Sequence, residues 1–264
     1  MDILRQSLAP IHDKAWEEIN EQAKSVLHAN LSARKFVDVE GPKGWDYGSV
    51  STGHLDIPNN QKGEVKYGVH RIQPMVESRV PFELDVWELD NIVRGAQDAD
   101  LAPLEEAARK MAEFEENAIF KGLKDASIDG LVGSSTQGKA KYPENPEEIL
   151  DSVSKAIGDF RQHSIEGPYS LIIDTTKWEK IAGYLKGYPL KRHIENLIGG
   201  SIILAPLFDE MALLVSERGG DFKLTLGTDI SVGYESHNEQ KVKLYFTESF
   251  TFQIFEPNAV IVME

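Results

Sequence analysis

The segment Phe82-Glu83-Leu84-Asp85-Val86-Trp87-Glu88-Leu89-Asp90-Asn91 is the most informative about the fold of this chain. Over residues 76–86 the even positions are apolar except at Ser78, and the odd positions are mostly charged. This two-residue period predicts a strand with one buried face. Trp87 falls on the polar face by this parity, although a helix beginning at Glu88 would redirect its side chain. A tryptophan there stacks on a planar ligand or packs against another chain, and we favour packing.

Three stretches have apolar residues at three- and four-residue steps, which predicts amphipathic helices. The first covers residues 14–34, with Asp13 as a candidate cap. The second covers 102–121 with Asp100 as a candidate cap, and it is long enough to form the spine of a domain. The third covers 146–162. A further helical region at 178–198 is interrupted at Gly187-Tyr188-Pro189.

The remaining segments favour β structure. Residues 46–75 have few large apolar side chains and a good turn composition at 58–63, which predicts a projecting hairpin stabilised by another subunit. The even positions from Val242 to Ile254 are apolar except at Glu248, so we expect one long strand. Short buried strands are predicted at 169–174, 202–204 and 212–215.

Composition excludes several classes of protein. The 264 residues suffice for one large or two ordinary domains, and the net charge of -15 argues against nucleic acid and anionic membranes as partners. There are no cysteines, so disulfides and thiolate sites are excluded. The N-terminus has no signal-peptide pattern, and no stretch is apolar enough to cross a membrane. We therefore expect a cytoplasmic protein whose assembly rests on apolar burial.

No combination of residues predicts catalysis. The segment Gly133–Lys139 has phosphate-loop spacing, but Ala140 replaces the hydroxyl residue that would meet Mg²⁺. Ser152 and Lys155 form a Ser-x-x-Lys pair without companion motifs. The seven histidines lack metal-binding spacing. We expect no catalytic residues, no metal site and no required cofactor, so the chain is predicted not to be an enzyme.

Several motifs occur together along nearly the whole chain. They are Ala33-Arg34-Lys35-Phe36-Val37-Asp38-Val39-Glu40-Gly41-Pro42, Ser216-Glu217-Arg218-Gly219-Gly220-Asp221-Phe222, Leu8-Ala9-Pro10, Gly44-Trp45, Gly167-Pro168-Tyr169 and Phe250-Thr251-Phe252, together with residues 82–91. In order and spacing they resemble the shell protein of encapsulin nanocompartments, family 1. The resemblance implies an α+β, phage major-capsid-like fold with a peripheral domain, an axial domain and an extended loop.

The resemblance also assigns parts of this chain to the domains of that fold. Residues 1–45 would form the N-terminal helix and the start of the peripheral domain, and 46–75 the extended loop. Residues 76–130 would continue the peripheral domain with its spine helix. The axial domain would cover 131–224, and 225–264 would add the C-terminal strands of the peripheral domain.

The function implied by the resemblance is structural. Such proteins form hollow icosahedral shells, commonly of about sixty copies. The shell encloses a cargo enzyme with a targeting peptide, either a ferritin-like iron oxidase or a dye-decolorising peroxidase, linking it to iron storage and oxidative stress. Leu27, Arg34, Asp38 and Ile230 are the candidate cargo-peptide contacts, and Leu27 is smaller than the aromatic residue expected there. The alternative is that these residues only pack the first helix against its sheet.

Two further sites follow from the resemblance. Tyr184, Leu185, Lys186, Gly187 and Tyr188 would belong to the loop that lines a five-fold pore. Trp87 and Arg79 are candidate residues for binding a flavin such as FMN, because some relatives bind flavin near that position. Two other functions are compatible with the sequence. One is a viral or prophage major capsid protein that packages DNA, and the other is a flavin-binding shell with a redox role.

Overall fold

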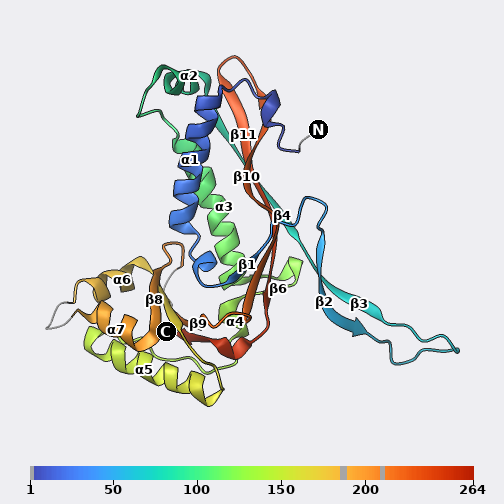
Figure 1. Ribbon diagram of the computed structural model, residues 1–264, viewed down its shortest axis with the longest axis vertical. Helices are drawn as coiled ribbons and strands as arrows, with labels where there is room; N and C mark the ends of the chain where they lie inside the picture. The colour runs from blue at the N-terminus through green and yellow to red at the C-terminus, as the bar shows by residue number, and fades with distance from the viewer. Residues whose placement is uncertain (1–2, 185–188, 209–211) are drawn as a thin grey trace.

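The computed structural model describes residues 3–184, 189–208 and 212–264. Figure 1 shows two packed bodies joined end to end, with a long hairpin projecting from their junction. The helices are α1 (Asp13–Asn30), α2 (Val86–Arg94), α3 (Ala102–Phe120), α4 (Leu131–Ser134), α5 (Pro146–Gln162), α6 (Thr175–Ala182) and α7 (Leu190–Ile198). Short 3₁₀ turns lie at Gln6–Leu8, Ala33–Lys35, Lys124–Ala126 and Pro257–Ala259.

The first body is built on a four-stranded sheet with the order β1-β10-β11-β4. Its strands are β1 (Asp38–Glu40), β10 (Phe222–His237), β11 (Lys241–Ile254) and β4 (Val76–Asp85), and only the β1–β10 pair is parallel. Helix α3 packs against β4 and β11, and α1 packs on α3. The spine helix is buried on most sides, and its Leu104 and Met111 are fully buried. This burial explains its strong apolar stripe.

The second body is built on a sheet with the order β12-β9-β7-β8. Its strands are β7 (Tyr169–Ile173), β8 (Gly199–Leu204), β9 (Ala212–Ser216) and β12 (Val260–Met263). All residues of β7, β9 and β12 are buried, which explains why these strands are continuous apolar runs without alternation. Helices α5, α6 and α7 lie beside this sheet (Figure 1). A small ladder of β5 (Gly122–Leu123) and β6 (Ile128–Asp129) follows α3.

The two bodies have separate hydrophobic cores, although α3, β10 and β11 run through both. On β11, Phe246 packs in the first core and Phe250 in the second. On α3, Ala112 belongs to the first core and Ala118 to the second. Polar residues, including the fully buried Glu248, occupy the level between them. We call this level the polar layer, defined by Glu115, Glu116, Asp229 and Glu248.

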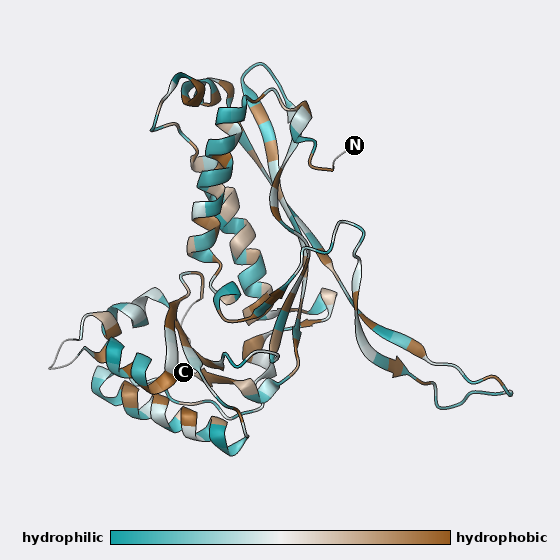
Figure 2. Cartoon of the chain, viewed as in Figure 1, coloured by the Kyte–Doolittle hydropathy of each residue, from teal (hydrophilic) through white to brown (hydrophobic). Residues whose placement is uncertain are grey.

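The projecting hairpin consists of β2 (Ser49–Asp56) and β3 (Val69–Pro74), which pair antiparallel. Its large apolar side chains are exposed: Leu55, Ile57, Val65, Tyr67, Val69 and Ile72. Figure 2 shows hydrophobic segments alternating with hydrophilic ones along the hairpin, away from both cores. An isolated two-stranded ribbon is marginally stable in water, so this surface requires a partner.

Most predicted elements are confirmed. The helices expected at 102–121 and 146–162 are α3 and α5, and the strand predicted from Val242 to Ile254 is β11. The hairpin at 46–75 is also present. Strand β10 was not predicted as one strand, because Gly227, Thr228 and Asp229 interrupt its apolar row.

Three details differ from the predictions. His12, not Asp13, is the N-cap of α1, because its ring Nδ1 accepts the Lys14 N–H at 3.2 Å. The first helix ends at Asn30, and a 3₁₀ turn follows. Asp100 accepts the Ala102 N–H at 3.0 Å, one residue before the N-cap position of α3. Trp87 does leave the strand parity as anticipated, although α2 begins earlier, at Val86.

Candidate functional site

A largely apolar cavity lies beside α1 and has a volume of about 590 Å³. One face of the helix forms a wall, since its lining residues recur at three- and four-residue steps. These residues are Asn20, Ala23, Lys24, Leu27, His28 and Leu31. Arg34 and Lys35 continue the wall after the helix, while Leu4 and Gln6 lie on the N-terminal side. We call this cavity the α1 pocket.

The opposite wall of the α1 pocket is a bulge in β10. Thr228 pairs with Ser249 and Ser231 pairs with Thr247, so Asp229 and Ile230 together face one residue of β11. A bulge of this kind redirects side chains. Ile230 consequently lines the pocket and is half-buried.

The N-terminal segment is fixed to the upper part of β10. The Leu4 carbonyl accepts the Tyr234 N–H at 2.8 Å, and the Gln6 side-chain amide donates to the Val232 carbonyl at 2.7 Å. The Tyr245 hydroxyl donates to the Ile3 carbonyl at 3.0 Å. These bonds hold the segment against the sheet, so that it closes one end of the α1 pocket.

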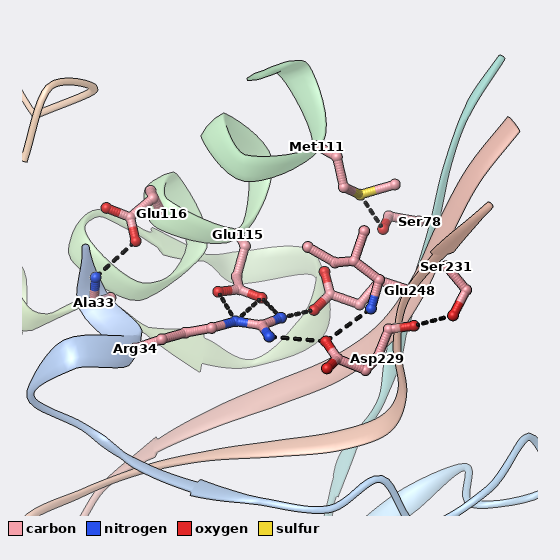
Figure 3. A network of polar contacts seen from close by, with 10 residues as sticks. Ala33, Arg34, Ser78, Met111, Glu115, Glu116, Asp229, Ser231 and Glu248 are labelled. Carbon is pink, nitrogen blue, oxygen red and sulfur yellow. Dashed lines mark hydrogen bonds and ion pairs between the residues drawn. The ribbon is translucent and has the colours of Figure 1, made fainter. Parts of the chain in front are cut away.

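Arg34 connects the pocket to the polar layer. Figure 3 shows its guanidinium between three carboxylates, each from a different part of the chain. Its Nε lies 2.8 Å from Glu115 Oε1, its Nη2 lies 2.7 Å from Glu248 Oε1, and its Nη1 lies 2.8 Å from Asp229 Oδ1. Glu115 and Glu248 are fully buried, whereas Asp229 is exposed. One arginine therefore ties α1's C-terminal side to α3, β11 and the β10 bulge.

The negative charge around Arg34 exceeds its single positive charge. Burial first, and then the neighbouring Glu115 carboxylate, raise the pKa of Glu248 well above its usual range. Glu248 therefore retains a proton more readily than an ordinary glutamate. Its Oε2 is buried and has no hydrogen-bond partner in the described part of the chain.

Glu116 makes a second connection to the same turn. The Ala33 N–H donates to its Oε1 at 2.8 Å, and the Ser32 hydroxyl donates to its Oε2. Burial raises the pKa of Glu116 to about 7, although these two hydrogen bonds act in the opposite direction. Consecutive glutamates of α3 thus bind consecutive parts of the 32–34 turn.

The structure brings together three of the four predicted peptide contacts. Leu27, Arg34 and Ile230 all line the α1 pocket. Asp38 lies outside that lining, in β1, where its Oδ2 accepts the Gly220 N–H at 2.6 Å. Sequence reasoning missed the buried carboxylates around Arg34. Glu248 could have revealed this cluster, because it is a charged residue within an otherwise apolar buried row and a buried charge needs a partner.

The other predicted sites have different outcomes. Leu185, Lys186, Gly187 and Tyr188 lie outside the described residues, while the Tyr184 hydroxyl donates to Glu147 Oε1 at 2.6 Å. This hydrogen bond does not bear on whether the loop lines a five-fold pore, which stays a prediction.

Trp87 and Arg79 do not converge within one chain. Trp87 is 70% exposed on α2. The Arg79 guanidinium lies over the Tyr245 ring, 4.3 Å from its centroid. Strand β4 pairs with β11 without a register shift from Val76 to Asp85, so the two residues stay on the order of 20 Å apart. Within a single chain these two residues do not form a flavin pocket.

No group of three or more His, Cys, Asp or Glu side chains is arranged to hold a metal ion in residues 3–184, 189–208 and 212–264. Within the same ranges, no helix is long and apolar enough to cross a membrane.

Comparison with known proteins identifies the family. The model of the family described as "Encapsulating protein for peroxidase" matches residues 1–251. The chain belongs to the encapsulin shell-protein family. It is 40% identical to the type 1 encapsulin shell protein of Mycolicibacterium paratuberculosis, covering 99% of this chain and 98% of that protein. It is 37% identical to the type 1 shell protein of Mycobacterium tuberculosis, over 100% of this chain and 99% of that protein.

Solved structures establish the fold of this encapsulin-family chain. A virus-like particle from Pyrococcus furiosus matches with a TM-score of 0.68 and 18% identity, covering 94% of this chain and 98% of that one. The capsid of Myoviridae phage XM1 matches with a TM-score of 0.56 and 11% identity, covering 89% and 92%. The predicted α+β, phage-capsid-like fold is therefore confirmed. The chain is a shell subunit of a multi-subunit assembly, as the resemblance implied.

Replacing Glu116 by Gln should change the pH dependence of stability. A carboxyl pKa raised to about 7 means that the folded state binds its proton more tightly than the unfolded chain. The stabilisation is therefore complete at low pH and is lost as the pH rises from about 4.5 through about 7. We expect Glu116→Gln to gain up to roughly 3 kcal/mol over the parent at pH 8, at about 1.4 kcal/mol per pH unit.

The measurement is the free energy of unfolding of both proteins at pH 5, 6, 7 and 8, at one subunit concentration. Glu113→Gln is the matched control, since Glu113 is exposed on the same helix. Parallel pH profiles for parent and Glu116→Gln would contradict the assignment.

Replacing Arg34 by Ala should be strongly destabilising. It leaves Glu115 buried without a cation, and breaking a buried ion pair costs about 3–5 kcal/mol. The loss should become smaller as the pH falls, because burial raises the pKa of Glu248 and its neutral form needs no cation. Denaturant titration measures this effect. Arg109→Ala is the control, because its exposed ion pair with Glu105 contributes about 1 kcal/mol or less. Equal losses in the two variants would rule out a structural role for the cluster.

Proposed function

We propose that copies of this chain close into a hollow icosahedral shell of about sixty subunits. The shell encloses a cargo enzyme that carries a targeting peptide, and it resides in the cytoplasm. The shell itself catalyses no reaction. The observation that carries the assembly proposal is the exposed apolar surface of the β2–β3 hairpin, which only another copy of the chain can bury repeatedly.

Charge supports the same mode of association. A net charge of -15 makes identical subunits repel one another at long range. Contacts between copies must therefore come from apolar burial and local pairing. The hairpin supplies six large apolar side chains, and its Asp56–Arg71 ion pair is already satisfied within the chain. We assign the hairpin as the extended loop, the body around β10 and β11 as the peripheral domain, and the body around β7 as the axial domain.

The α1 pocket is the proposed docking site for the cargo peptide. It combines an apolar floor with a polar rim, which suits a short amphipathic segment. Leu27 and Ile230 would contact apolar side chains of the peptide, and Arg34 would hold the β10 bulge in place through Asp229. A peroxidase is the favoured cargo, because the family description names one. A ferritin-like iron oxidase is the other cargo class.

Charging the hairpin should prevent shell closure. In Leu55→Asp/Ile72→Asp, two exposed apolar side chains become carboxylates, and the variant should remain folded but form only small species. Light scattering and electron microscopy should show megadalton particles for the parent but not for the double variant. Arg71→Gln removes an exposed charge and its ion pair with Asp56 but no apolar side chain, so it is the control and should assemble. A parent protein that is a stable monomer would refute the shell, and full-size particles of the double variant would refute the role of the hairpin.

Charging the α1 pocket should empty the shell without dismantling it. Ile230→Asp places a carboxylate in the apolar part of the pocket, and we expect at least about a tenfold loss of cargo. The readout is the mass-spectrometric ratio of cargo to shell in particles isolated from the producing cells. Asp38→Asn separately tests the fourth predicted contact, which lies outside the pocket lining. Unchanged loading in intact Ile230→Asp particles would remove the docking assignment.

A further inference from the structure

The charges that line the α1 pocket are unevenly distributed. Its lining contains the basic residues Lys24, Arg34 and Lys35 and one carboxylate, Asp229. This is the reverse of the whole chain, in which 43 acidic residues outnumber 28 lysines and arginines. A local excess of positive charge on such a chain calls for a reason.

The pocket's own carboxylate does not balance the lysines. Asp229 is paired with Arg34 at 2.8 Å. The other two carboxylates on Arg34, Glu115 and Glu248, are fully buried and do not line the pocket. Burial also raises the pKa of Glu248, so this group favours its neutral form more than an ordinary glutamate does.

Lys24 and Lys35 are left without a counter-charge. Both are exposed, and neither forms an ion pair with any residue in the described ranges. Lys24 projects from the α1 stripe that forms one wall, and Lys35 lies beyond the helix on the same lining. Two free ammonium groups therefore border an apolar surface that includes Leu27, Leu31 and Phe246.

We propose that the α1 pocket selects an acidic peptide: an extended segment with apolar side chains and an aspartate or glutamate that pairs with Lys24 and Lys35. This inference rests on the proposed docking function and specifies its partner. The apolar side chains lie on the floor between α1 and the β10 bulge, and the carboxylate lies at the lysine rim. Charge complementarity then discriminates among peptides that have similar apolar side chains.

The experiment reverses the charge at the two lysines on the rim of the pocket. A fluorescent protein with a pool of randomised ten-residue C-terminal tails is produced together with the full-length shell protein. Tails recovered from purified particles are identified by mass spectrometry and compared with the input pool. The shells are the parent, Lys24→Glu/Lys35→Glu, and the control Lys14→Glu/Lys155→Glu. The control makes the same change in net charge at exposed lysines outside the pocket lining.

Aspartate and glutamate should be enriched by about two- to fivefold in tails from the parent and control shells, the range for partly exposed ion pairs. In Lys24→Glu/Lys35→Glu the preference should shift to lysine and arginine. Enriched apolar tails without an acidic bias, or the same bias in both double variants, would overturn the charge selection and leave the docking site intact. Tails loaded no better than the untailed protein would overturn both.

Discussion

Arg34 places one positive charge between Glu115 of α3 and Glu248 of β11, at the level where the two hydrophobic cores meet. If apolar side chains replaced Arg34 at this level, the carboxylates of Glu115 and Glu248 would be buried without a cation. An unpaired buried charge is costly, so the two bodies join correctly only when the 32–34 turn places Arg34 between these carboxylates. The rest of the architecture follows from this constraint.

The same constraint shapes the α1 pocket. Because Arg34 also binds Asp229, the β10 bulge is held against the end of α1, and Ile230 is presented to the cavity. The pocket is therefore formed by residues that already have structural roles. The charge of Arg34 in the pocket wall is paired with Asp229 of the same chain, whereas Lys24 and Lys35 at the rim have no such partner in the part of the chain that the structure describes. Joining the two bodies and forming the pocket thus depend on one side chain.

Periodicity predicted the separate elements well, because each carries its own signal. The apolar stripe at 102–121 located α3, and the even-numbered row from Val242 located β11. The assembly of these elements was recognised only through the resemblance to a known family. The ion-pair cluster could not be predicted, because it joins residues up to 214 positions apart. The β10 bulge was likewise hidden, since polar residues within a strand resemble a loop in sequence.

The polar layer also bears on the curvature of the closed container. Strand β11 has 14 residues and is about 48 Å long, with Glu248 near its middle. A 1 Å change in an ion-pair length there, acting over a lever arm of about 20 Å, tilts one body against the other by about 3°. Repeated around a closed surface, a tilt of that size alters the radius at which the surface meets itself. In the proposed shell, the lengths of the bonds to the Arg34 guanidinium would therefore affect the radius of curvature.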